Sequence, residues 1–282
     1  MSALLRRCGA MLLLALSLGA ATAQAAPMVV ATYNLRLDLA SDGPNAWPQR
    51  KAMVMAMIRY HGWDLFGTQE GLPNQIADLE TLAEYGRVGV GRDDGKSGGE
   101  HAALFYRRAR FELLAHGDFW LSTTPDEPSM GWDARCCKRL ASWLRLRDRQ
   151  TQKSFTAFSV HFDHEGVVAR RESARLMLRK IAEIGGSEPV ICVGDFNATP
   201  DSEPIRLMSA ALRDARLHSA TPPYGPVGTF NDFKLDAPMK DRIDYVFVGA
   251  GVRVLKYGVL SDNLDGRYPS DHHPVVTTLE LE

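Results

Sequence analysis

Short apolar runs bounded by polar residues recur along the whole chain. Runs of this length and composition predict β-strands. Several of them are almost continuously apolar, as in strands covered on both faces of a sheet, whereas Ser142–Leu146 and Val275–Leu281 alternate, as half-exposed strands do. The other predicted strands are Met28–Tyr33, Asp64–Thr68, Ala102–Tyr106, Phe155–Val160, Val190–Val193 and Ile243–Val248.

Three segments carry their apolar residues at helical spacing instead. The first spans Pro48–Tyr60 and opens on a proline, which suits the first turn of a helix. The second spans Val168–Ile184, and the two glycines after it predict its end. A weaker helix is predicted over Glu203–Arg213.

The order of these elements predicts the fold class. Strand, helix and strand follow one another in each half of the sequence, with extra strands between the halves. This order favours an α/β fold in which two mixed β-sheets pack face to face, with helices outside, as a four-layer sandwich.

The N-terminus has the pattern of a signal peptide. Arg6 and Arg7 precede an apolar stretch, Met11 to Ala21, and Ala23-Gln24-Ala25 is typical of a cleavage site. We therefore expect residues 1–25 to be a signal peptide and residues 26–282 to form one catalytic domain. The protein is expected to be exported, either to the periplasm or into the medium.

Net charge limits the possible partners. Without Arg6 and Arg7, 31 basic residues remain against 34 acidic ones, a formal net charge of −3. Domains that coat nucleic acid usually carry a basic excess, so this role is not indicated, although a metal-dependent nuclease is compatible with the charge. We expect no further membrane-spanning segment and infer no obligate protein partner.

Three cysteines follow the predicted cleavage site. Cys192 lies in a predicted buried strand and is expected to be a small core residue. Cys136 and Cys137 lack the spaced partners of a zinc site, which favours a structural role for them. The odd number leaves at least one thiol free.

Polar residues stand where four of the apolar runs end. Asn34 follows the first predicted strand, Glu70 the second, His161 the fifth and Asp195 the sixth. Side chains at the ends of core strands converge on one crevice in α/β proteins, and that crevice usually holds the ligand.

The chemistry of these residues suits a hard cation. Glu70 and Asp195 supply carboxylates, and Mg²⁺ and Mn²⁺ prefer oxygen ligands. Asn197 follows Asp195 by two positions, so an extended backbone places both side chains on one face. The carboxamide is then able to donate to a phosphate oxygen while the carboxylate holds a metal or a water molecule.

Asp271 and His272 are the most specific functional signal in the sequence. They stand just before the final strand, where one can bind metal and the other can contact a phosphoryl oxygen or water. Asp244 is the candidate that orients the His272 imidazole. His273 points to the opposite face of an extended segment, so only one of the two histidines is expected to face the site.

Together these motifs resemble the signature of the endonuclease/exonuclease/phosphatase superfamily, in its order and approximate spacing. The resemblance implies a deoxyribonuclease I-like fold and hydrolysis of phosphate esters that depends on Mg²⁺ or Mn²⁺. The residues that carry it are Tyr33-Asn34, Gln69-Glu70, His161, Gly194-Asp195-x-Asn197, Asp244-Tyr245 and Ser270-Asp271-His272.

The resemblance also implies roles for single residues. Glu70 is similar to the principal metal ligand, with Asn34 and Asp271 close to the metal. The implied catalytic set is Asp195 for the attacking water, Asn197 and His161 for the phosphate and its developing charge, and His272 held by Asp244. The resemblance leaves open whether the site binds one metal ion or two.

Finer motifs are similar to a secreted bacterial branch of metal-dependent hydrolases. They include Tyr33-Asn34-Leu35-Arg36 and His161-x-Asp163-His164. With a Gly-rich loop that ends in Glu100, they supply the substrate-binding candidates Arg36, Glu100, Asp163 and His164.

The sequence therefore predicts an exported metal-dependent phosphoesterase, with in-line attack of water on a phosphodiester as the favoured reaction. Two alternatives stay open. One is a phosphatase acting on a phosphorylated sugar, inositol or lipid headgroup, and the other is a relative that only binds.

Overall fold

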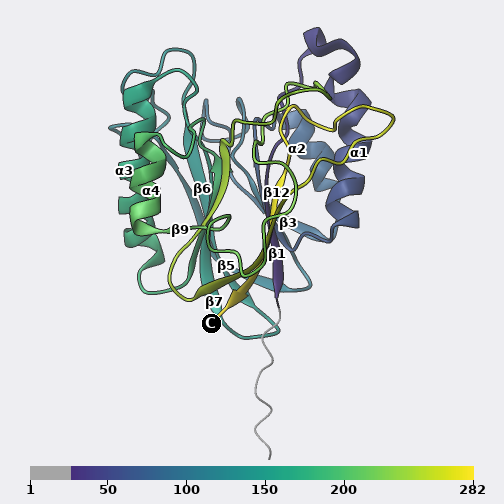
Figure 1. Cartoon of the computed structure of the whole chain (residues 1–282). Coiled ribbons are helices and arrows are strands. Elements are labelled where there is room, and N and C mark those ends of the chain that lie inside the picture. The colour runs from purple at the N-terminus through teal and green to yellow at the C-terminus, as the bar shows by residue number, and fades with distance from the viewer. Residues whose placement is uncertain (1–26) are drawn as a thin grey trace, which may run out of the picture.

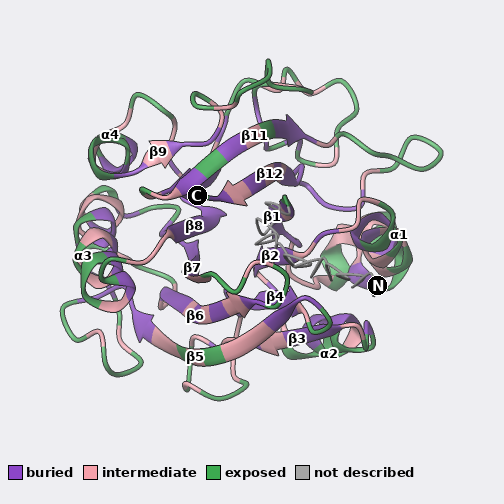
Figure 2. Ribbon diagram, turned by 90° about the horizontal axis from the view of Figure 1, so that it is seen from below, coloured by how far each residue is buried: buried purple, intermediate pink, exposed green. Residues whose placement is uncertain are grey.

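Two six-stranded sheets face each other in the computed structural model, and helices cover their outer surfaces (Figure 1). The structure describes residues 27–282, so the predicted signal peptide lies outside the described residues. Seen along the sandwich, α1 and α2 lie beside one sheet and α3 and α4 beside the other (Figure 2). This is the four-layer α/β arrangement that the order of elements predicted.

The first sheet has the strand order β11-β12-β1-β2-β4-β3, and the second has the order β5-β6-β7-β8-β10-β9. The strands of the first sheet are β1 (Met28–Asn34), β2 (Leu65–Gln69), β3 (Tyr85–Val88), β4 (Leu104–Arg107), β11 (Val252–Val259) and β12 (Val275–Leu281). Those of the second are β5 (Phe111–Trp120), β6 (Leu140–Asp148), β7 (Ser154–His161), β8 (Val190–Asp195), β9 (Arg213–Asp214) and β10 (Asp244–Val248).

The α-helices are α1 (Trp47–Tyr60), α2 (Pro73–Glu80), α3 (Val167–Gly185) and α4 (Glu203–Ala211), and η1 (Ala40–Asn45) is a 3₁₀ segment. The proline at the start of α1 and the glycine after α3 stand where the sequence placed them. The predicted end of α4 was too late, because Leu212 is already extended and Arg213 pairs with β10. In the described part of the chain, no helix has the length and apolar character that a membrane crossing needs.

Three apolar layers hold the sandwich together. The central layer lies between the sheets and includes Val30, Leu146 and Val246. A second packs α1 and α2 against the first sheet, and a third packs α3 and α4 against the second sheet. Both faces of the central strands are therefore buried, which explains their almost continuous apolar runs.

Strand direction brings the site residues to one end of the sandwich. β1 runs parallel to β2, and β7 runs parallel to β8. Asn34 at the end of β1 contacts Asp195 at the end of β8, so all four strands end on the same side. β12 pairs antiparallel with β1, and β10 pairs antiparallel with β8, so both begin there. The ends of β1, β2, β7 and β8 and the starts of β10 and β12 therefore lie together at one end of the sandwich.

Gly67 marks a close approach of the two sheets just before the site. A Cβ atom at this position of β2 would lie 2.6 Å from Val193 Cγ2 and 2.8 Å from Ser159 Oγ, which belong to β8 and β7. Real Cβ atoms do not approach side chains this closely, so a larger residue requires the Val193 and Ser159 side chains, or the strands that carry them, to shift.

We predict that Gly67→Ala lowers the free energy of unfolding by about 2 kcal/mol, because overpacked cores typically lose 1–3 kcal/mol. Urea denaturation followed by circular dichroism measures this loss. Gly249→Ala is the matched control, since its nearest neighbours, atoms of Val190, lie at an ordinary 3.5 Å. Equal stability of the two variants would show that the sheets do not require a glycine at this contact.

Candidate active site

A cavity of about 380 Å³ opens where the strand ends meet, and the polar residues predicted from the sequence gather in it. Asp195 ends β8 and stands beside Asp244 in the β8–β10 register, and His161 ends β7 in register with Asp195. Asn34 ends β1, and Glu70 follows β2 directly. The residues come from both sheets, so the site exists only when the sandwich is closed.

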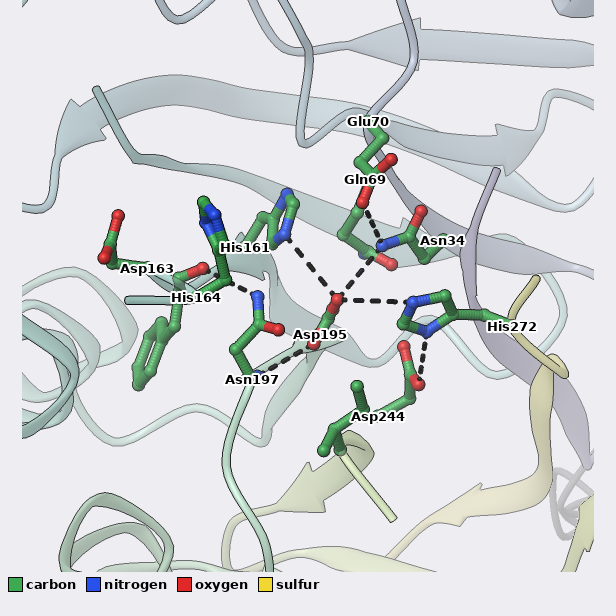
Figure 3. A network of polar contacts seen from close by, with 12 residues as sticks. Asn34, Gln69, Glu70, His161, Asp163, His164, Asp195, Asn197, Asp244 and His272 are labelled. Carbon is green, nitrogen blue, oxygen red and sulfur yellow. Dashed lines mark hydrogen bonds and ion pairs between the residues drawn. The ribbon is translucent and has the colours of Figure 1, made fainter. Parts of the chain in front are cut away.

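Asp195 is the centre of the polar network (Figure 3). Asn34 Nδ2 donates to Asp195 Oδ2 at 3.0 Å and to Glu70 Oε1 at 2.9 Å, which ties a carboxylate of the second sheet to one that follows the first. The backbone N–H of Asn197 donates to Asp195 Oδ1 at 2.8 Å. Two separated carboxylates are therefore held in one orientation by neighbouring amides.

The two histidines approach Asp195 from opposite sides (Figure 3). His272 Nε2 lies 3.9 Å from Asp195 Oδ2, and His161 Nε2 lies 3.6 Å from the same oxygen. His272 Nδ1 is 2.9 Å from Asp244 Oδ2, which is the orienting contact predicted for that pair. His273, in contrast, packs its ring against Tyr268 at 4.7 Å between centroids and is not among the residues that line the cavity.

Opposite neighbours drive the pKa values of the two histidines apart. Burial alone would lower the pKa of His272, but the Asp244 carboxylate raises it well above its usual value. Burial and the Arg139 guanidinium hold the pKa of His161 well below its usual value. At neutral pH these opposite shifts favour the imidazolium form of His272 and the neutral form of His161.

Arg139 is a residue that the sequence analysis missed. It is 5% exposed, and its Nη1 lies 3.1 Å from the His161 ring nitrogens while Nη2 donates to His164 Nδ1 at 2.7 Å. It follows Lys138 in a polar segment that shows no helix or strand periodicity. The sequence therefore contains no signal that distinguishes Arg139 from an ordinary surface arginine. Arg92 was missed for the same reason, although it also lines the cavity.

The four substrate-binding candidates separate into two groups. Arg36, Glu100 and His164 line the cavity. Glu100 pairs with Arg92 at 2.6 Å, and burial raises the pKa of Glu100 to about 7 despite that partner. Asp163 is not among the lining residues: its Oδ1 accepts from the backbone of Glu165 and Gly166, so we assign it to holding the loop before α3.

The remaining predicted residues lie within or beside the network. Asn197 lines the cavity, and its Nδ2 donates to Phe162 O at 3.0 Å. Asp271 also lines it, 3.8 Å from Arg36 Nη1. The carboxamide oxygen of Asn34 accepts from the Arg36 backbone at 2.9 Å, which leaves Nδ2 to donate to both Glu70 and Asp195.

The donor set fits a hard divalent cation. Glu70 Oε and Asp195 Oδ atoms lie within 4.8 Å of each other, and Asp271 adds a third carboxylate to the cavity. His272 is close to both, but as an imidazolium it has no lone pair for a metal and is left out of the donor set. Burial and a neighbouring carboxylate raise the pKa of both Asp195 and Asp271. Buried carboxylates that repel one another gain most from a bound cation, and oxygen ligands select Mg²⁺ or Mn²⁺.

A second cluster of potential ligands does not form a comparable site. Cys136, Asp163 and His164 also lie within 4.8 Å of one another, but the Cys136 sulfur is bonded to that of Cys137. A disulfide sulfur is a poor ligand because the metal-binding form of cysteine is the thiolate.

Residues 31–272 match the model of the Endonuclease/Exonuclease/phosphatase family. A Bacteroides vulgatus structure described as an endonuclease/exonuclease/phosphatase is 41% identical, with a TM-score of 0.87, over 91% of this chain and 100% of that one. A mannosyl-6-phosphatase of Bacteroides thetaiotaomicron is also 41% identical, with a TM-score of 0.85, over 89% of this chain and 99% of that one.

Curated relatives are more distant and longer. Nocturnin of Drosophila melanogaster is 24% identical over 83% of this chain. The chain spans 42% of that protein and 26% of a matching mimivirus protein, which is less than half of either.

We predict that Glu70→Gln weakens Mn²⁺ binding by about tenfold or more, because loss of a charged oxygen ligand removes attraction for the cation. Isothermal titration calorimetry of Mn²⁺ into the purified protein measures this change. Glu80→Gln is the control, since Glu80 pairs with Arg87 on the surface of α2. The same Mn²⁺ affinity in both variants would remove Glu70 from the ligands.

Proposed function

The chain belongs to the endonuclease/exonuclease/phosphatase family, and from that premise we propose that it hydrolyses the phosphate monoester of a phosphorylated sugar. The observation that carries the proposal is Asp195, buried and held between Asn34, His161 and His272 at the base of the cavity. A carboxylate in this position is within reach of a water molecule and of a phosphate group together.

Two observations favour a sugar monoester over the phosphodiester that the sequence favoured. The cavity volume, about 380 Å³, is at the lower end of the range for small-molecule sites. The mannosyl-6-phosphatase matches this chain at 41% identity over nearly its whole length, and its name supports a similar class of substrate here.

The residues divide the work of hydrolysis between them. Asp195 orients the attacking water and accepts its proton. His272, charged and held by Asp244, donates a hydrogen bond from Nε2 to a phosphoryl oxygen, where negative charge develops. His161 stays neutral and is able to contact the phosphate without trapping it as an ion pair.

Glu70 and Asp271 would hold the divalent cation, and Asn34 would fix the orientation of Glu70 toward it. A cation held there would supply positive charge beside the phosphate. Arg36, Arg92 and Arg139 line the same cavity and complement a dianionic monoester, although each is already paired with an acidic residue.

We also propose that the protein acts outside the cytoplasm. The N-terminal residues have the order of charged, apolar and small residues that signal peptides have. The Cys136–Cys137 disulfide supports this location, because disulfides persist in oxidising compartments.

The reaction is tested by phosphate release from mannose 6-phosphate and by nitrophenol release from bis(p-nitrophenyl) phosphate. We expect Mg²⁺ or Mn²⁺ to support the first activity, EDTA to abolish it, and the second to be much slower. Asp195→Asn should lower the rate about a thousandfold, because the residue that activates water is lost while its shape is kept. Faster cleavage of the diester would restore the phosphodiesterase assignment.

The two adjacent histidines should respond very differently to substitution. We expect His272→Ala to lower kcat by about two to three orders of magnitude, as loss of a donor to the developing charge does. His273→Ala should change kcat by less than about threefold, since His273 packs against Tyr268 outside the cavity. Steady-state kinetics at saturating metal decides this, and similar losses in both variants would overturn the assignment of His272.

A further inference from the structure

Cys136 and Cys137, adjacent in the sequence, are joined by a disulfide. The sequence favoured a structural role for the two cysteines. Cys192, in contrast, is buried in β8 as a free thiol, as the apolar run around it predicted.

This disulfide does little to stabilise the fold. A cross-link stabilises mainly by restricting the unfolded chain, and the effect grows with the number of residues in the loop that it closes. A bond between neighbours closes no loop of the chain. Its consequences are therefore local, at the place where the two sulfurs lie.

That place is the wall of the active-site cavity. Cys137 is half-buried and lines the cavity together with Asp195 and His272, and Cys136 is exposed. The Cys136 sulfur lies within 4.8 Å of a ring nitrogen of His164. His164 in turn accepts a hydrogen bond from Arg139, so the disulfide lies on the Arg139 side of the cavity.

The segment that carries the disulfide is firmly attached on both sides. Asp133 accepts from the backbone of Val168 and Ala169 at the start of α3, at 3.1 and 2.6 Å. Lys138 Nζ donates to Asp93 O at 2.7 Å, and Arg139 is buried against His161. The sulfurs thus have a fixed position on the wall.

A second apolar surface lies on the other flank. Phe230 lines the cavity and packs its ring against His272, 5.2 Å between centroids. His161 and His272 stand on opposite sides of Asp195 (Figure 3). The disulfide lies near His164 and Arg139 on the His161 side, and Phe230 packs on His272, so the two apolar surfaces flank the place where a phosphate would sit. Most of the other lining residues are charged or polar.

We infer that the Cys136–Cys137 disulfide is a substrate-binding surface that packs against the apolar C–H face of the sugar. The inference rests on the proposed function, since it concerns the alcohol part of the same substrate. Sulfur is polarisable and weakly hydrated, so it suits contact with an apolar face. Two side chains locked in one ring also lose no rotamer freedom when the sugar binds.

The test compares two ligands in an inactive background. In Asp195→Asn, turnover is expected to be about a thousandfold slower. Calorimetry with a short titration therefore measures the binding of mannose 6-phosphate and of inorganic phosphate. Adding Cys136→Ser with Cys137→Ser should weaken the sugar phosphate about fivefold to tenfold, the size expected for one lost apolar contact. Inorganic phosphate, which lacks the sugar, should bind equally well to both proteins.

Chemical reduction supplies an independent control. Tris(2-carboxyethyl)phosphine should weaken sugar phosphate binding to the disulfide-containing protein and leave the serine variant unchanged. The melting temperature should differ by less than about 2 °C, because no loop is opened.

Three results would overturn the inference. They are equal sugar phosphate affinity in both proteins, a parallel loss of inorganic phosphate binding, and undetectable sugar phosphate binding to either. Failure of the proposed function looks different: the wild-type protein would bind mannose 6-phosphate without hydrolysing it, and the affinity comparison would still decide the role of the disulfide.

Discussion

The hydrogen bonds of the Asn34 carboxamide to Glu70 and Asp195 are the contacts on which the site depends. They place two carboxylates from different sheets side by side in a largely buried position, where like charges repel and burial disfavours the ionised form. The Asn34 amide compensates part of this cost, and in our proposal a bound cation compensates the rest. The close approach of the sheets at Gly67 brings the strand ends that carry these carboxylates together. Arginines that line the cavity place positive charge around them.

The same logic explains why two histidines beside one carboxylate differ in charge. His272 has the Asp244 carboxylate behind it and is stabilised as a cation, whereas His161 has the Arg139 guanidinium beside it and is kept neutral. In the proposed reaction, a single positive imidazole would donate to the developing charge on the phosphate, and the neutral one would limit the positive charge of the site. The tuning residues belong to separate segments, β10 and the loop before β6, so the difference is built by tertiary structure.

Burial determines which strands could be predicted from the sequence. All eight predicted strands exist, and they are the interior strands of the two sheets, whereas the four unpredicted ones, β3, β5, β9 and β11, are the edges. Polar and exposed residues interrupt β5 and β11, and β3 and β9 are only four and two residues long, so the apolar pattern of all four is weak. In the site, residues at the ends of interior strands were predictable, as Asn34 and Asp195 show. Arg139 and the Cys136–Cys137 pairing were not, because loop packing alone brings them to the cavity.

The central claim is that one cavity between the sheets holds both the cation and the phosphate. A crystal structure of the protein with Mn²⁺ and inorganic phosphate, using anomalous scattering to locate the metal, tests it most directly. The account predicts an anomalous peak bound by Glu70, with the phosphate between His161 and His272 and next to Asp195. A manganese ion bound elsewhere, or a phosphate outside this cavity, would contradict it.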